Sequence, residues 1–76
     1  MINLTEAKAE KEYTIKQITA KEPIRARLLS FGFAKGNKIT VLEYTLTKQT
    51  YDVVIEDSQV ALRKEEAESI LVEEAL

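Results

Sequence analysis

The segment from residue 38 to residue 46 constrains the fold most, because its apolar residues change face part-way along it. One set is Ile39 and Val41, and the other is Leu42, Tyr44 and Leu46. A β-bulge or a sharp bend near Val41 reconciles the two sets. A very small barrel requires such bending of its long strand, since a flat sheet of this size cannot close on itself. The segment therefore predicts a small barrel rather than a sandwich.

Alternating apolar residues predict the remaining strands. They lie at residues 13–19, 51–55 and 60–62, and the apolar triplet at 70–72 suits a closing strand. The tight connection at 56–59 contains Asp57, a residue type that tolerates left-handed backbone geometry. Together with the bent strand, these segments predict a mainly β protein with about five strands.

Short helical segments are predicted between the strands. Pro23 suits the first position of a helix over residues 23–31, with Ile24, Leu28 and Phe31 as one apolar stripe. Gly32 is placed to end this helix in the left-handed conformation, with Phe33 packing back over the last turn, and Gly36 supplies the positive φ of a following turn.

Two single helical turns are also expected. Asn3 and Glu6 have the spacing of a capping box, which predicts a turn before the first long strand. Residues 64–69 suit another turn, with acidic residues near its start.

The length allows one domain over residues 1–76 and one core. The absence of cysteine excludes disulfides, so packing alone must hold the core, as suits a reducing cytosol. Uninterrupted apolar runs reach only three residues, whereas a membrane span needs roughly 20. The N-terminal segment also lacks the apolar region of a signal peptide. We therefore expect a cytoplasmic protein without direct membrane insertion, which reaches any membrane through a partner.

Charge is unevenly distributed along the chain. Residues 1–38 contain eight basic and four acidic residues, and residues 39–76 contain three and nine. This asymmetry is typical of two solvated faces of a folded domain, and it can also steer a partner of opposite polarity. The density of positive charge is below that of a nucleic-acid-binding surface.

The residue inventory argues against catalysis and against a tight metal site. Histidine and cysteine are absent, which removes the commonest general base, the thiol nucleophile and the preferred ligands of transition metals. The two glycines match neither a phosphate loop nor a dinucleotide motif. The acidic residues near the C-terminus, including Glu65, Glu66 and Glu68, are interpreted as surface solvation. We expect no enzyme activity, no cofactor and no bound metal.

Exposed apolar residues are expected at the far end of the long hairpin. Because the bent strand changes face beyond Val41, some later apolar residues should pass the small interior of the barrel. Tyr44, Leu46 and Tyr51 are the candidate protein-binding residues. Two alternatives are that they close the barrel mouth or that they mediate self-association. Tyr44 and Tyr51 would also serve a nucleic-acid-binding barrel, but the acidic balance of the chain argues against that function.

Three segments together resemble the FeoA domain: RLLSFGFAKG at 27–36, the following ITVLE, and YDVVIEDSQVALRKEEAESILVE at 51–73. The matching positions are Arg27, Leu28, Gly32, Gly36, Ala61, Leu62, Arg63, Glu66, Ala67 and residues 70–72. The order and spacing of these residues, rather than any single one, identify the resemblance. Arg27 and Arg63 are expected to brace the helix and the hairpin, and the glycines to serve the backbone.

The resemblance implies a bacterial SH3-like five-stranded barrel that takes part in ferrous iron transport. It implies a cytosolic, non-enzymatic adaptor or regulator, and the partner it implies is the FeoB permease, a membrane protein with a cytosolic GTPase region. The same domain type occurs at the C-terminus of iron-dependent repressors of the diphtheria-toxin repressor class, so a stand-alone regulatory module is the alternative. The chain departs from the family pattern in three turns. Glu10 or Lys11 and Asp57 replace two glycines, and a proline after the long strand is absent.

Overall fold

The computed structural model describes residues 1–75, so residue 76 of the expected domain lies outside the described part. Most of the regular secondary structure is β-strand, as predicted. The strands are β1 (Ile2–Asn3), β2 (Glu12–Ile18), β3 (Lys38–Tyr44), β4 (Thr50–Ile55), β5 (Ser58–Arg63) and β6 (Ile70–Glu74). The helical segments are the 3-10 helix η1 (Leu4–Glu6) and the α-helices α1 (Ile24–Ser30) and α2 (Lys64–Glu68). No helix among residues 1–75 is long and apolar enough to cross a membrane.

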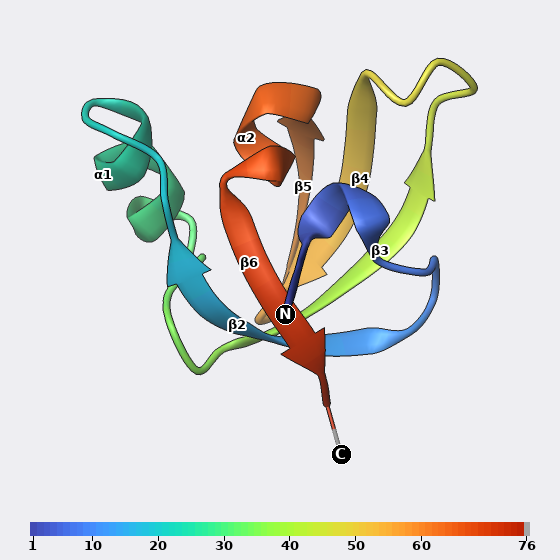
Figure 1. Ribbon diagram of the computed structural model, residues 1–76, viewed down its shortest axis with the longest axis horizontal. Helices are drawn as coiled ribbons and strands as arrows, with labels where there is room; N and C mark the ends of the chain where they lie inside the picture. Colours follow the sequence, from blue (N-terminus) through green and yellow to red (C-terminus); the bar gives the residue numbers. More distant parts are fainter. Residues whose placement is uncertain (76) are drawn as a thin grey trace.

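The strands form one bent antiparallel sheet that curls around the core (Figure 1). Its order is β1-β6-β2-β3-β4-β5, so the last strand lies between the first two. Within the described residues β1 and β5 are edges that do not pair with each other, and the barrel is therefore open. The sixth strand, β1, was not predicted, because two residues are too few to show an alternating pattern.

The predicted irregularity of the long strand is confirmed in β3. Val41 pairs with Val53 and Glu43 pairs with Asp52, which leaves Leu42 as the extra residue of a bulge. Val41 is buried, but the residues beyond the bulge are exposed. The bulge is thus the reason that the later part of β3 leaves the core.

The end of α1 agrees with the prediction, but its apolar stripe does not. Gly32 has a φ of 98°, and the N–H groups of Gly32 and Phe33 donate to the carbonyls of Leu29 and Leu28 at 3.0 and 3.1 Å. This is the hydrogen-bond pattern of a Schellman motif. Only Leu28 of the expected stripe is buried, and Ile24 and Phe31 are exposed. The predicted burial of the whole stripe was wrong because α1 has only seven residues and contacts the core mainly through Leu28.

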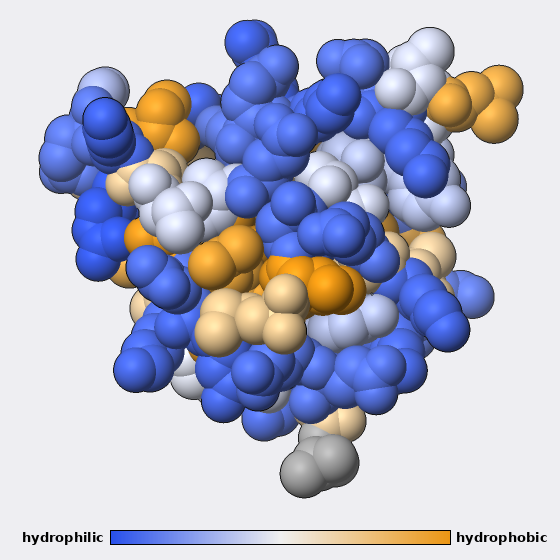
Figure 2. Space-filling model, viewed as in Figure 1, coloured by the Kyte–Doolittle hydropathy of each residue, from blue (hydrophilic) through white to orange (hydrophobic). Residues whose placement is uncertain are grey.

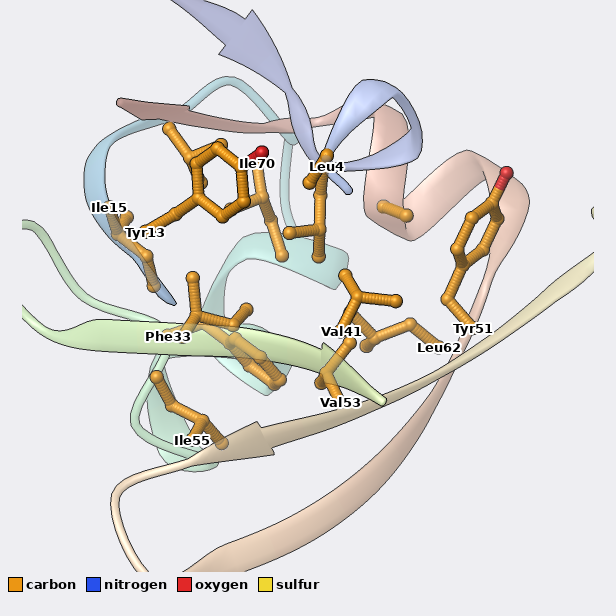
Figure 3. Close-up of a cluster of buried hydrophobic side chains, with 14 of the residues drawn as sticks. Leu4, Tyr13, Ile15, Phe33, Val41, Tyr51, Val53, Ile55, Leu62 and Ile70 are labelled. Atoms are coloured by element: carbon orange, nitrogen blue, oxygen red, sulfur yellow. The ribbon is translucent and has the colours of Figure 1, made fainter. Parts of the chain in front are cut away.

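The core consists of apolar side chains from every strand except the two-residue β1, together with η1, α1, α2 and the loop after α1. Fully buried members include Leu4, Ile15, Leu28, Phe33, Val41, Val53, Ile55, Ile70 and Val72. Figure 3 shows this cluster between β3 and β4 on one side and the N-terminal segment on the other. These buried residues form one continuous core.

Two predicted turns differ in how well they agree with the structure. The side-chain oxygen of Asn3 accepts the N–H of Thr5 at 2.9 Å, and Glu6 accepts the N–H of Asn3 at 3.1 Å, so the capping box is confirmed. In the β4–β5 connection, Glu56 rather than Asp57 takes the positive φ, of 54°. The prediction chose the residue with the better left-handed propensity, but the register Ile55 to Ser58 places Glu56 first in a two-residue turn.

Candidate protein-binding site

The end of the β3–β4 hairpin carries the most exposed apolar side chain of the described chain. Leu46 has an exposed fraction of 103% and Tyr44 one of 44%. In Figure 2 an apolar side chain projects from the end of this loop. The bulge at Leu42 directs the strand away from the core, so these residues have no interior to fill. Of the three residues predicted from the sequence, two lie on this surface.

Tyr51, the third predicted residue, is buried, with an exposed fraction of 2%. It pairs with Tyr44 across β3 and β4, and the two ring centroids lie 5.8 Å apart with the planes tilted by 39°. Tyr51 thus supports the ring of Tyr44 from the core side instead of belonging to the exposed surface. Burial, followed by the negative charge of Glu68, raises the pKa of the Tyr51 hydroxyl above its ordinary value.

Hydrogen bonds fix the backbone of the hairpin loop on both sides of Leu46. The hydroxyl of Thr45 accepts the N–H groups of Gln49 and Thr50 at 3.0 and 3.3 Å. The N–H of Lys48 donates to the carbonyl of Thr45 at 2.8 Å. Lys48 also has a positive φ of 57°, and its ammonium lies 5.4 Å from the centre of the Tyr44 ring. The loop therefore presents a defined surface, which we call the hairpin tip: Tyr44, Leu46 and Lys48.

Three of the FeoA-like motif residues, Arg27, Arg63 and Glu66, come together at a second place, between α1 and α2. The Arg27 guanidinium of α1 lies 3.2 Å from the Glu66 carboxylate of α2, and Glu66 also accepts the N–H of Arg63 at 2.9 Å. The Glu66 side chain is only 7% exposed. The interpretation of Glu66 as a solvated surface acid was wrong. Its position three residues after Arg63, the spacing of a capping acid, was the signal that could have identified it.

A depression of about 430 Å³ lies beside this ion pair. Its lining includes Ala20 and Ile24 as apolar residues, and three acidic and three basic side chains: Lys21, Glu22, Arg27, Arg63, Glu65 and Glu66. Glu22 accepts the N–H of Ala26 at 2.9 Å, so this acid stabilises the start of α1. The balanced charges and internal hydrogen bonds support the expectation that Arg27 braces the helix.

The other motif residues serve the backbone or the core. Leu28 and Leu62 are buried. Gly36 has a φ of 94°, and a Cβ atom added there would meet no other atom within 4 Å, so only its backbone conformation requires glycine. The hairpin tip and α1 lie at opposite ends of the long axis in Figure 1. The α1 part of the motif and the hairpin tip are therefore separate, whereas Leu62 and Arg63 of β5 pair with Tyr51 and Thr50 at the base of the hairpin.

The family model of the FeoA domain matches residues 2–74. The chain belongs to the FeoA family. A relative from Helicobacter pylori, provisionally named Fe(2+) transport protein A, is 37% identical over 76 residues, which cover 99% of this chain and 100% of the relative. The family is therefore one of ferrous iron transport, as the sequence resemblance implied.

Solved structures support the same family and its fold. The solution structure of the FeoA protein from Chlorobium tepidum has a TM-score of 0.91 at 27% identity, covering 99% of this chain and 71% of that one. The crystal structure of FeoA from Stenotrophomonas maltophilia complexed with zinc, described as a prokaryotic SH3 domain protein, has a TM-score of 0.85 at 22% identity and covers 96% and 91%. The SH3-like fold is thus confirmed.

The fold also occurs within larger regulators. The chain aligns with 41% of a manganese-dependent transcriptional repressor, with a TM-score of 0.85 at 20% identity and coverage of 97% of this chain. At this identity the similarity concerns the fold alone.

Proposed function

We propose that the protein is a cytoplasmic, non-enzymatic accessory of ferrous iron uptake that docks on the cytosolic GTPase region of an FeoB-type permease through the hairpin tip. Membership of the FeoA family supports the role in ferrous iron transport. The observation that carries the docking surface is the complete exposure of Leu46 on an internally hydrogen-bonded loop.

The hairpin tip has the features of a small protein-binding anchor. Because hydrogen bonds fix the loop backbone that carries Leu46, less backbone freedom is lost on binding and more of the burial energy appears as affinity. Tyr44 adds an amphipathic ring beside it, and aromatic residues are enriched where binding energy concentrates. The buried ring of Tyr51 packs against the ring of Tyr44 and supports its position. The contact would thus centre on Leu46, with Tyr44 as its neighbour.

Leu46→Glu tests the proposal, with Leu29→Glu as the matched control. Both leucines are exposed, and Leu29 lies on α1, at the other end of the molecule. Leu46→Glu should leave the melting temperature unchanged and weaken capture by the permease's cytosolic domain by about 1 to 3 kcal/mol. Leu29→Glu should leave capture intact. Retained capture by a folded Leu46→Glu variant, or loss only in the control, would place the contact elsewhere.

Self-association and a regulatory role are the competing functions. If Leu46 joins two copies of the chain, the wild-type protein should elute earlier from gel filtration as its concentration rises, and Leu46→Glu should abolish that shift without affecting capture. The fold shared with a transcriptional repressor is the observation that favours a regulatory module. A transcript-level response to deletion of the gene, with iron uptake unchanged, would favour that alternative.

A further inference from the structure

The charge asymmetry of the sequence is concentrated in a segment without acids. No aspartate or glutamate occurs between Glu22 and Glu43, although the chain contains 13 acidic residues. The basic residues of the segment are Arg25, Arg27, Lys35 and Lys38. Arg27 is engaged by Glu66, so the remaining basic side chains of α1 and the following loop are the ones available to a ligand.

Three basic side chains from three elements surround one depression of about 350 Å³. They are Lys16 of β2, Arg25 of α1 and Lys35 of the loop after α1, and the other lining residues are Gln17, Ile18 and Leu29. Within residues 1–75, no acidic side chain lines this depression. We call Lys16, Arg25, Leu29 and Lys35 the basic face.

Backbone contacts to β2 hold these groups together. Lys16 is the extra residue of a second bulge, because Ile15 pairs with Val72 and Gln17 with Leu71. The N–H of Gly36, next to Lys35, donates to the carbonyl of Ile15 at 2.8 Å. The Arg25 guanidinium donates to the carbonyl of Ile18 at 2.8 Å. These contacts fix the backbone at Lys16 and next to Lys35, and the guanidinium of Arg25, so the three basic residues are held around one depression.

The surroundings of the basic face leave most of its charge uncompensated. In the described part of the chain its one ion pair joins Lys16 to Glu73 at 3.8 Å, with both side chains about half exposed. Such a pair is weak and is screened by salt. Leu29 stands among the basic groups with an exposed fraction of 42%. In Figure 2 hydrophilic and apolar side chains lie side by side over α1 at the left of the view.

We propose that the basic face contacts the anionic surface of a lipid bilayer. Clustered Lys and Arg side chains are attracted to acidic headgroups, and one exposed leucine can enter the interface between headgroups and acyl chains. The contact is peripheral and needs no spanning segment. It adds a direct peripheral contact to the route through a partner that the sequence predicts.

The position of the basic face is compatible with docking by the hairpin tip. Because α1 and the tip lie at opposite ends of the long axis, a lipid surface and a protein can be contacted at the same time (Figure 1). Two weak contacts of this kind reinforce each other when their geometry allows both. The lipid contact itself is independent of any permease, so it can be measured with the isolated protein.

Vesicle flotation tests the proposal with phosphatidylcholine vesicles that contain or lack phosphatidylglycerol. The protein should float with the anionic vesicles only, and salt should abolish binding. Lys35→Glu, in an exposed loop, should weaken partitioning on the order of fivefold or more, and Arg25→Glu/Lys35→Glu roughly twenty-fold or more. Lys8→Glu/Lys64→Glu makes the same change in net charge at residues outside both the basic face and the hairpin tip and should retain binding.

Several results would overturn the proposal. Equal binding to neutral and anionic vesicles would exclude headgroup charge as the cause of binding. Equal loss of binding in Lys8→Glu/Lys64→Glu would show that net charge alone explains the effect. If the reversal variants float normally but lose capture by the permease's cytosolic domain, the basic face binds an acidic protein surface instead. Leu29→Glu should weaken flotation and Leu46→Glu should not, so the failure of one proposal leaves the other measurable.

Discussion

The guanidinium of Arg27 on α1 lies 3.2 Å from the carboxylate of Glu66 on α2, which also accepts the N–H of Arg63. One nearly buried acid therefore fixes the start of α2 and links α1 to α2. Glu66→Ala should lower the free energy of unfolding by about 1 to 3 kcal/mol, because the N–H of Arg63 loses its acceptor. Glu66→Gln keeps an acceptor and should cost less. Urea unfolding of the two variants measures the difference.

Arg27→Met separates the two functions of this acid. The Arg27 side chain is more than half exposed, so its removal should cost below about 1 kcal/mol in urea unfolding. A larger loss for Arg27→Met than for Glu66→Ala would show that the ion pair, rather than the backbone hydrogen bond, dominates this contact.

Gly36→Ala should destabilise the protein through the backbone alone. The space around Gly36 is open, but its φ of 94° disfavours a residue with a Cβ atom. The loss should be about 1 to 2 kcal/mol. Gly36→Asn should lose less because asparagine tolerates positive φ. Thermal melting of the two variants checks the order, and an unchanged Gly36→Ala protein would contradict it.

Glu10→Gly should stabilise the protein. Glu10 has a φ of 65°, and its N–H donates to the carbonyl of Val41 at 2.7 Å, an interaction that glycine retains. Relief of the left-handed strain outweighs the entropy cost of glycine by about 0.5 to 1 kcal/mol, measurable as a higher midpoint of urea unfolding. Glu10→Ala is the control and should give no gain. Equal stability of both variants would mean that the turn is not strained.

Tyr51 should make the protein less stable at high pH. Its pKa is raised by burial above the ordinary value of 10.0, so the unfolded chain releases this proton first. The stabilisation that results from this shift is complete below the pKa of the unfolded chain and is lost as the pH rises through the pKa of the folded protein. Relative to Tyr51→Phe, the wild-type free energy of unfolding should therefore fall above about pH 10. A constant difference between the two proteins across that range would contradict the raised pKa.

The isolated protein should bind no Fe(II) tightly. It contains neither histidine nor cysteine, the residues that provide most strong ligands for iron. Anaerobic calorimetry should detect no stoichiometric binding at submicromolar concentrations. A saturable one-to-one isotherm in that range would contradict the prediction and would require a site built from oxygen ligands.

The sequence predicted features that depend on local patterns and missed those that depend on distant partners. The bulge at Leu42 and the helix end at Gly32 follow from the period of the apolar residues and from backbone preference. The spacing of Glu66 from Arg63 was a local signal that was missed, but its ion pair with Arg27, far earlier in the chain, has no local pattern. The burial of Tyr51 could have been inferred, since it alternates with Val53 and Ile55, both of which face the core.

The two candidate surfaces differ in the same way: one has a local signal in the sequence and the other depends on contacts between distant segments. The exposure of Tyr44 and Leu46 follows from the change of face in β3. The basic face requires the bulge at Lys16 and the contact between Gly36 and Ile15, which joins segments on either side of α1. Short segments such as β1 also carry too few residues for a periodic signal.

The place of β6 between β1 and β2 sets the time at which the protein can fold during synthesis. Val72 lies opposite both Ile2 and Ile15, and Ile70 and Val72 are fully buried. A growing chain that stops before Ile70 leaves both early strands without this neighbour and the core open on one side. The ribosome must therefore complete almost the whole domain before the first strands find their final partner, and a product truncated there has no stable core.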